Sequence, residues 1–304
     1  MSDSLNEAAA LPEAAAPALT PAARTPAPPP SAPIKTGTDW WAELRGIVWL
    51  VLAVLGFHSF IAKPFYIPSE SMMPGLLTGD RLVVSKYPYG WSWVSPSFHI
   101  LPFLNGRLLG NLPERGDVVI AVPPGEHEDY IKRVVGLPGD RIEVRGGLLI
   151  LNNVPVKRSA GFAARIPVDA NAPCTQTDYP GALRSGPDGK DVCELPAYRE
   201  TLPNGRSYTI LDTGYSMGDD YAPITVPANR VFLMGDNRDH SADSRYSLES
   251  QGLGGPVPWE NIGGRAEFIT FSLDGTAVWW NPLSWFTAMR GGRAWTSLHP
   301  NQGK

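Results

Sequence analysis

The sequence of 304 residues has only two cysteines and no block of basic residues. Its 26 Lys and Arg and 30 Asp and Glu give a net charge of -4, which argues against a nucleic-acid-binding protein. No apolar stretch begins near the N-terminus, so we expect no cleaved signal peptide. After the first apolar run no helical period of useful length appears, and this favours a β architecture for the remainder.

Residues 1–38 are rich in Ala and Pro and contain few large apolar side chains. Such a segment cannot offset its chain entropy by burial, so we predict a disordered tail. A Pro-rich ligand for a partner domain is the less favoured interpretation of the same residues.

Residues 39–63 are predicted to form one transmembrane helix. The run from Gly46 to Ala62 carries no formal charge. At about 1.5 Å per residue it extends roughly 26 Å, near the lower limit for a membrane span. Because the run is apolar on every face, a span is favoured over a buried core helix. Aromatic residues lie at the expected interfacial levels on both sides: Trp40, Trp41, Phe65 and Tyr66.

Residues 64–275 are predicted to form a mainly β domain with antiparallel strands. Runs rich in β-branched residues alternate with Pro-Gly or Gly-Gly turns. The expected strands lie at 81–85, 117–122, 130–135, 141–145, 148–151, 154–157, 230–234 and 264–273. Residues 87–112 are expected to form an aromatic loop or hairpin. Residues 159–227 are polar and rich in Gly and Pro, which indicates an irregular lobe inserted into the β core, with one strand at 208–211.

The C-terminal segment, residues 276–304, is rich in aromatic residues. It contains Trp279, Trp280 and Trp285, together with Arg290 and Arg293. Aromatic side chains combined with cations suit the interface of a bilayer, so we predict that this segment rests on the membrane.

The stretch from Ile67 to Asp80 holds the most informative pattern. Pro68 and Pro74 bracket two serines, Ser69 and Ser71. Because proline fixes φ and restricts the residue before it, this stretch is a shaped loop that carries hydroxyl groups. Most serines in such loops only bond local backbone. A serine becomes a nucleophile when a base removes its proton and donors receive the oxyanion.

Two later stretches supply the missing partners, residues 129–140 and residues 235–245. In this order, the three stretches resemble the bacterial type I signal peptidases, the membrane-bound Ser-Lys leader peptidases. The resemblance runs from about Trp49 to about Leu273 and is weakest between 159 and 227. It implies a membrane-bound serine endopeptidase that removes signal peptides from exported preproteins after a small-x-small motif. It also implies a cytoplasmic N-terminus and a catalytic domain on the outer face of the bacterial inner membrane.

The resemblance assigns the catalytic residues. Ser71 matches the nucleophile, and the Ser69 side chain with the backbone N–H of Ser71 matches the oxyanion hole. Lys132 matches the general base, and Ser241 matches the hydroxyl that orients the lysine amine. A free lysine has a pKa near 10.4, so a base that works near neutrality needs this value lowered by about 3 units. Burial without a carboxylate partner has this effect.

Further positions follow from the same resemblance. Five residues match a charged loop that supports the site, where charges are tolerated because they pair: Asp236, Asn237, Arg238, Asp243 and Arg245. A calcium loop is the competing interpretation of these aspartates, and it fails because the ligand spacing and central glycine of an EF-hand are absent. Six positions match the apolar walls of a shallow substrate pocket: Phe65, Ile67, Pro68, Leu76, Leu82 and Ile131. No metal or organic cofactor is implied, and the expected partners are preproteins and membrane lipid.

Some positions depart from the family pattern. Glu70 stands between the two serines where a small residue is usual, so it adds a negative charge beside the developing oxyanion. Gly75 replaces a Thr, and His240 stands where Asn is often found. The third of the matching stretches, residues 235–245, is called the third motif below, and residues 247–256 lengthen the segment after it. Cys174 and Cys193 are expected to form a disulfide, because both lie in one loop-rich lobe outside the cytoplasm. Neither thiol lies in a motif, so the bridge is expected to be dispensable for chemistry.

Three other functions would require different residues. A Ser-His-Asp hydrolase would use His240, which lies between Asp239 and Asp243. A penicillin-binding type enzyme needs a later Lys-Thr-Gly, and the only candidate begins at Lys35, before the span. A membrane-tethered β domain that binds peptides or lipid without catalysis would lack Ser71 or Lys132, and both are present.

Overall fold

The computed structural model describes residues 39–96, 106–186 and 189–302. The predicted N-terminal tail therefore lies outside the described residues, as do Phe98 and Phe103 of the aromatic loop. The chain divides into two units, Met1–Gly46 and Ile47–Lys304. In the described residues, the helix α1 (Trp40–Phe60) is the one element long and apolar enough to cross a membrane, and its apolar window is not buried by protein.

The largest sheet contains most of the lysine stretch, and the serine loop connects two of its strands. It has seven strands in the order β1-β2-β16-β3-β4-β14-β15, and its strand pairs are antiparallel. Their bounds are β1 (Ala62–Tyr66), β2 (Asp80–Ser85), β16 (Ile262–Ser272), β3 (Val118–Ala121), β4 (Tyr130–Gly136), β14 (Arg230–Met234) and β15 (Val257–Pro258). Central strand β3 is a run of four buried apolar residues, as expected for a strand covered on both faces.

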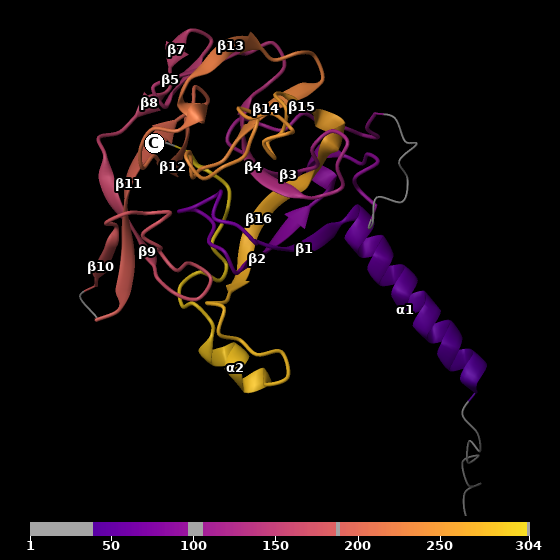
Figure 1. Cartoon of the computed structure of the whole chain (residues 1–304). Helices are drawn as coiled ribbons and strands as arrows, with labels where there is room; N and C mark the ends of the chain where they lie inside the picture. Colours follow the sequence, from indigo (N-terminus) through magenta and orange to yellow (C-terminus); the bar gives the residue numbers. More distant parts are fainter. Residues whose placement is uncertain (1–38, 97–105, 187–188, 303–304) are drawn as a thin grey trace, which may run out of the picture. The chain divides into compact units, whose positions relative to one another are not determined.

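Two smaller sheets complete the β architecture in Figure 1. The first contains β13 (Tyr221–Thr225), β5 (Arg141–Arg145), β6 (Leu148–Leu151) and β7 (Val154–Pro155). The second contains β10 (Leu183–Ser185), β11 (Asp191–Thr201), β12 (Arg206–Leu211) and β17 (Asn301–Gln302), with β8 (Lys157–Arg158) and β9 (Phe162–Pro167) paired to β11. The prediction of a mainly antiparallel β fold after one apolar helix is confirmed.

Short helical turns connect the strands. The described residues contain the 3-10 turns η1 (Tyr87–Tyr89), η3 (Met217–Asp219) and η4 (Trp259–Asn261). One further α-helix, α2 (Pro282–Thr287), follows β16 and projects beyond the end of that strand in Figure 1. Asn281 caps α2, because its side chain accepts a hydrogen bond from the backbone N–H of Leu283.

The segment 159–227 is more regular than its composition indicates. Its strand β11 runs over eleven residues and pairs with β8, β9, β10 and β12. Tyr208 and Ile210 of β12 belong to the same buried cluster as Ile142 of β5 and Phe232 of β14. The segment is therefore continuous with the β core on this side, and the name inserted lobe is kept below for residues 159–227.

Candidate active site

The serine loop, residues 67–80, is closed on itself by backbone hydrogen bonds. The Ile67 N–H donates to the carbonyl of Asp80, and the Gly79 N–H donates to the carbonyl of Ile67. The side chain of Asp80 accepts from the N–H of Leu77 at 2.8 Å. Gly79 has φ +97°, and a Cβ there would lie 2.1 Å from the carbonyl oxygen of Leu273, so only glycine fits. These bonds fix the shape of the loop that presents Ser71.

Lys132 of β4 and Ser71 of the loop meet in the interior. The Lys132 Nζ donates to the Ser71 Oγ at 2.9 Å. Both side chains are buried, with 3% of Lys132 and 5% of Ser71 exposed. Burial lowers the pKa of Lys132 from 10.5 to about 8, against the opposing effect of the Asp243 and Asp236 charges. The direction matches the expectation from the sequence, and an amine in this state can accept the serine proton.

Ser69 lies beside the nucleophile. Its Oγ is 3.4 Å from the Oγ of Ser71, and the residue is exposed to solvent. A hydroxyl at this position can donate to an oxyanion formed next to Ser71, together with a backbone N–H. The position is therefore compatible with the role expected from the resemblance.

Ser241 lies close to the pair, but it does not make the expected bond to the lysine amine. Its Oγ is buried and has no hydrogen-bond partner among the described residues. A Cβ on Gly235 would lie 2.1 Å from this oxygen and 2.5 Å from the carbonyl oxygen of Ser71. The absence of a side chain at Gly235 thus lets the third motif approach the nucleophile. The Lys132 amine is bonded to Ser71 instead.

No hydrogen bond or ion pair joins His240 to Ser71 among the described residues. Its Nδ1 lies 3.8 Å from a carboxylate oxygen of Glu70, and its ring centroid lies 4.7 Å from that of Tyr179. Asp239 accepts hydrogen bonds from Thr213 and Gly214 instead of binding this imidazole. The geometry therefore favours Lys132 over His240 as the base.

The charged loop is paired, but largely with residues outside its own motif. Asp236 binds Arg133 of β4 through two hydrogen bonds of 2.7 and 2.6 Å. Arg238, 2% exposed, binds Glu200 of β11, which is fully buried. Asp243 and Arg245 pair with each other at 2.9 Å. The sequence predicted pairing among the motif charges, and only the last pair follows that pattern.

Asn237 binds the nucleophile's own segment. Its backbone N–H donates to the carbonyl of Ser71 at 3.1 Å, and its side-chain Nδ2 donates to the carbonyl of Glu70 at 3.2 Å. The third motif therefore binds the peptide groups on both sides of Ser71, Glu70–Ser71 and Ser71–Met72.

Five of the six predicted pocket residues gather in one buried cluster. Ile67, Leu76, Leu82 and Ile131 are buried in it, and Phe65 packs against it while partly exposed. Pro68 is exposed and lines a different cavity of about 280 Å³ with Ser69, Glu70 and Tyr179. The four buried members therefore belong to the apolar core of the domain, and of the five only Phe65 is partly exposed.

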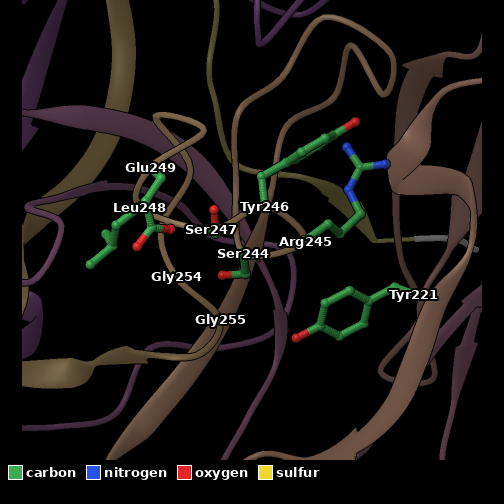
Figure 2. A pocket seen from close by; sticks show the side chains of 9 residues that line it. All are labelled: Tyr221, Ser244, Arg245, Tyr246, Ser247, Leu248, Glu249, Gly254 and Gly255. Carbon is green, nitrogen blue, oxygen red and sulfur yellow. The ribbon is translucent and has the colours of Figure 1, made fainter.

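A larger cavity lies behind the third motif, and Figure 2 shows its lining. It has a volume of about 400 Å³, and Arg245, Tyr246 and Tyr221 contribute side chains. The added residues 247–249 and 254–255 form its other wall. Neither Ser71 nor Lys132 lines this cavity, so it is separate from the serine-lysine pair.

Two residues of the inserted lobe reach the site without any signal in the sequence. Glu200 lies on β11 and binds Arg238, as described above. The Tyr179 phenol donates a hydrogen bond to the Glu70 carboxylate at 2.8 Å. Both lie in the segment where the resemblance is weakest, and neither belongs to a recognisable local pattern.

The cysteines of the lobe are joined in the structure. Cys174 and Cys193 form a disulfide with a Cα–Cα distance of 5.7 Å. The bridge closes the segment that contains Tyr179.

The aromatic C-terminal segment is exposed, but its arginines are not free. Trp279, Trp280 and Phe286 are each at least 70% exposed. Arg290 binds Asp169 at 2.7 Å, and Arg293 pairs with Asp80 of the serine loop. The expectation that these cations face a membrane together with the tryptophans is therefore not supported, since both guanidinium groups are used inside the protein. No group of His, Cys, Asp and Glu suited to a metal ion occurs among the described residues.

Comparison with known proteins identifies relatives along most of the chain. A family model described as signal peptidase, peptidase S26, matches residues 40–271. Signal peptidase I of Rickettsia typhi is 33% identical over 256 residues, which cover 81% of this chain and 85% of the relative. Signal peptidase I of Rickettsia akari is 32% identical over 255 residues, covering 80% and 82%.

A solved structure was matched as well. It is a signal peptidase I from Enterococcus faecalis V583, with 22% sequence identity and a TM-score of 0.26. The match covers 51% of this chain and 97% of the solved one.

Proposed function

The chain belongs to the signal peptidase I family of S26 peptidases, and from that premise we propose that it cleaves signal peptides with Ser71 as nucleophile and Lys132 as general base. The observation that carries this proposal is the 2.9 Å hydrogen bond from the buried Lys132 amine to the Ser71 hydroxyl. A pKa of about 8 gives roughly 300-fold more neutral amine at pH 7 than a pKa of 10.5 does.

The proposed reaction begins when the neutral Lys132 amine takes the proton of the Ser71 hydroxyl. The Ser71 Oγ then attacks the carbonyl carbon of the scissile bond, and the oxyanion is bound by the Ser69 hydroxyl and the Ser71 backbone N–H. The Lys132 ammonium gives its proton to the departing amine, so an acyl-enzyme remains on Ser71. The lysine, neutral again, takes a proton from a water molecule that attacks the ester carbonyl. When the ester C–O bond breaks, the Lys132 ammonium returns this proton to the Ser71 Oγ, and the signal peptide leaves with a new C-terminal carboxyl group.

The substrate is proposed to be a preprotein with small residues at the first and third positions before the scissile bond. A shallow apolar pocket at the positions that match the family's pocket walls, among them Ile67, Leu76 and Ile131, would fit alanine and exclude larger side chains. An extended peptide would present these two positions to the same side. The support is the family membership together with the apolar character of these positions.

Cleavage of a signal-bearing precursor tests the proposal. The full chain in detergent is expected to release the mature protein when alanine occupies both positions, and to lose at least tenfold in kcat/KM when leucine replaces either one. Ser71→Ala should abolish turnover, whereas Ser185→Ala, on an exposed strand of the inserted lobe, serves as the matched control. Equal cleavage by Ser71→Ala and the unchanged protein would reject the proposed nucleophile.

We also propose the membrane arrangement of a single-pass protein. α1 would span the inner membrane with its N-terminus in the cytoplasm, so that the β domain meets exported precursors on the outer face. The exposed Trp279, Trp280 and Trp285 near α2 would rest on the bilayer, since they otherwise form an exposed apolar patch.

A liposome experiment tests the lipid contact. A protein that lacks the span should bind vesicles, and changing the three tryptophans to Ser should weaken that binding. Tyr215→Ser removes an exposed aromatic side chain in the inserted lobe and serves as the control. Unchanged binding by the triple variant would reject the proposed contact.

A further inference from the structure

Tyr179 joins the inserted lobe to the serine loop by two hydrogen bonds. Its phenol donates to the Glu70 Oε2 at 2.8 Å and accepts from the Asn237 Nδ2 at 3.0 Å. The side chain is only 5% exposed. Burial and then the Glu70 charge raise the pKa of Tyr179, so the phenol keeps the proton that it donates. The phenol O–H donates a hydrogen bond to the Glu70 carboxylate, and the phenol oxygen accepts one from the Asn237 side-chain amide.

Asn237 is also hydrogen-bonded to the segment that carries the nucleophile. Its side-chain amide donates to the carbonyl of Glu70, and its backbone N–H donates to the carbonyl of Ser71. Tyr179 also belongs to a buried apolar cluster with Met73 and Leu77 of the serine loop. The lobe is therefore packed and hydrogen-bonded against the segment that carries Ser71.

The negative charge of Glu70 explains why these contacts matter for the site. It lies between the two serines whose hydroxyls are 3.4 Å apart, and its side chain is 37% exposed. A carboxylate that rotated toward these hydroxyls would accept a hydrogen bond from the Ser69 hydroxyl and would repel the negative charge of the oxyanion. In the structure the carboxylate instead contacts Tyr179 and, at 3.8 Å, His240.

We propose that Tyr179 is a positioning residue that holds the Glu70 carboxylate away from the oxyanion hole, and that the inserted lobe thereby takes part in catalysis. The inference rests on the proposed function of Ser71 and Ser69. It accounts for a carboxylate at a position where it would otherwise slow the reaction. It also gives the disulfide-closed segment a role, because Cys174 and Cys193 close the chain around Tyr179.

Tyr179→Phe tests the inference, because it removes only the phenol oxygen. With the full chain in detergent, we expect kcat for precursor cleavage to fall about tenfold while KM stays within about twofold, since one hydrogen bond to a charged group is lost. In the Glu70→Gln background, the same Tyr179→Phe change should reduce kcat by less than about twofold, because no carboxylate charge has to be held away. Tyr215→Phe, an exposed tyrosine of the same lobe, is the matched control.

Two results would overturn the inference. One is a Tyr179→Phe protein with the kcat of the unchanged protein. The other is a Tyr179→Phe change that lowers kcat equally with Glu70 present and in the Glu70→Gln background, which would indicate a role in packing alone. Thermal unfolding of each variant confirms that folded proteins are compared. If the unchanged protein fails to cleave the precursor, or if Ser71→Ala cleaves it equally well, the proposed function fails instead, and the two failures are distinguishable.

Discussion

Replacing Lys132 by Met should make the folded protein more stable at pH 7. The amine has a pKa of 10.5 as a free group and of about 8 in the folded state. Because one pKa unit corresponds to about 1.4 kcal/mol, the folded state loses roughly 3 kcal/mol when it carries the charged lysine. Met has a similar length and no charge. Losing the bond to the Ser71 hydroxyl offsets about 1 kcal/mol, so a net gain of about 2 kcal/mol is expected.

The difference in stability between the unchanged protein and Lys132→Met depends on pH, and this dependence identifies the lysine charge as its cause. Since the folded pKa lies below the unfolded one, the penalty is complete below pH of about 8 and disappears toward pH 10.5, where both states hold a neutral amine. The stability of the unchanged protein should therefore rise relative to Lys132→Met by about 1 kcal/mol between pH 8 and pH 9. Urea unfolding of both proteins in detergent measures this difference. An unchanged protein that is equally stable at pH 7, or a difference that does not vary with pH, would refute the reasoning.

Two further substitutions test the residues that support the site. Gly235→Ala would place a Cβ 2.1 Å from the Ser241 hydroxyl, so we expect kcat to fall at least tenfold and the free energy of unfolding to fall by about 1–3 kcal/mol. Gly214→Ala, with nothing within 4 Å of the added Cβ, is the control and should change neither quantity in the same turnover and unfolding assays. Glu200→Gln leaves the buried Arg238 without its anion, so urea unfolding should show a loss of about 3–5 kcal/mol, and a loss below 1 kcal/mol would contradict the pairing.

The sequence predicted the β architecture because the strands of the main sheet are short apolar runs separated by glycine and proline turns. The strand β3, for example, lies within the predicted 117–122. The long strand β11 was not predicted, because it contains Pro196 and the charged residues Glu194 and Glu200, which favour a loop on composition alone. Its pairing with four other strands overrides that local preference.

Only the site residues that lie in the matching motifs were predicted from the sequence. The proximity of Ser71 and Lys132 followed from a resemblance between long motifs, whereas Tyr179 and Glu200 come from a segment without one. Arg290 and Arg293 illustrate the same limit. Together with the tryptophans they suggested a membrane interface. Their partners, Asp169 and Asp80, are distant in the sequence and become neighbours only through the fold.

The central claim is that Lys132 and not His240 is the base that activates Ser71. The most direct measurement is kcat/KM for precursor cleavage by Lys132→Met and His240→Ala, with both proteins shown to be folded. We predict that Lys132→Met has almost no turnover and that Lys132→Arg is equally poor, because a guanidinium stays protonated. His240→Ala should keep much of the activity. An active Lys132→Met together with an inactive, folded His240→Ala would contradict the account and favour a Ser-His-Asp mechanism.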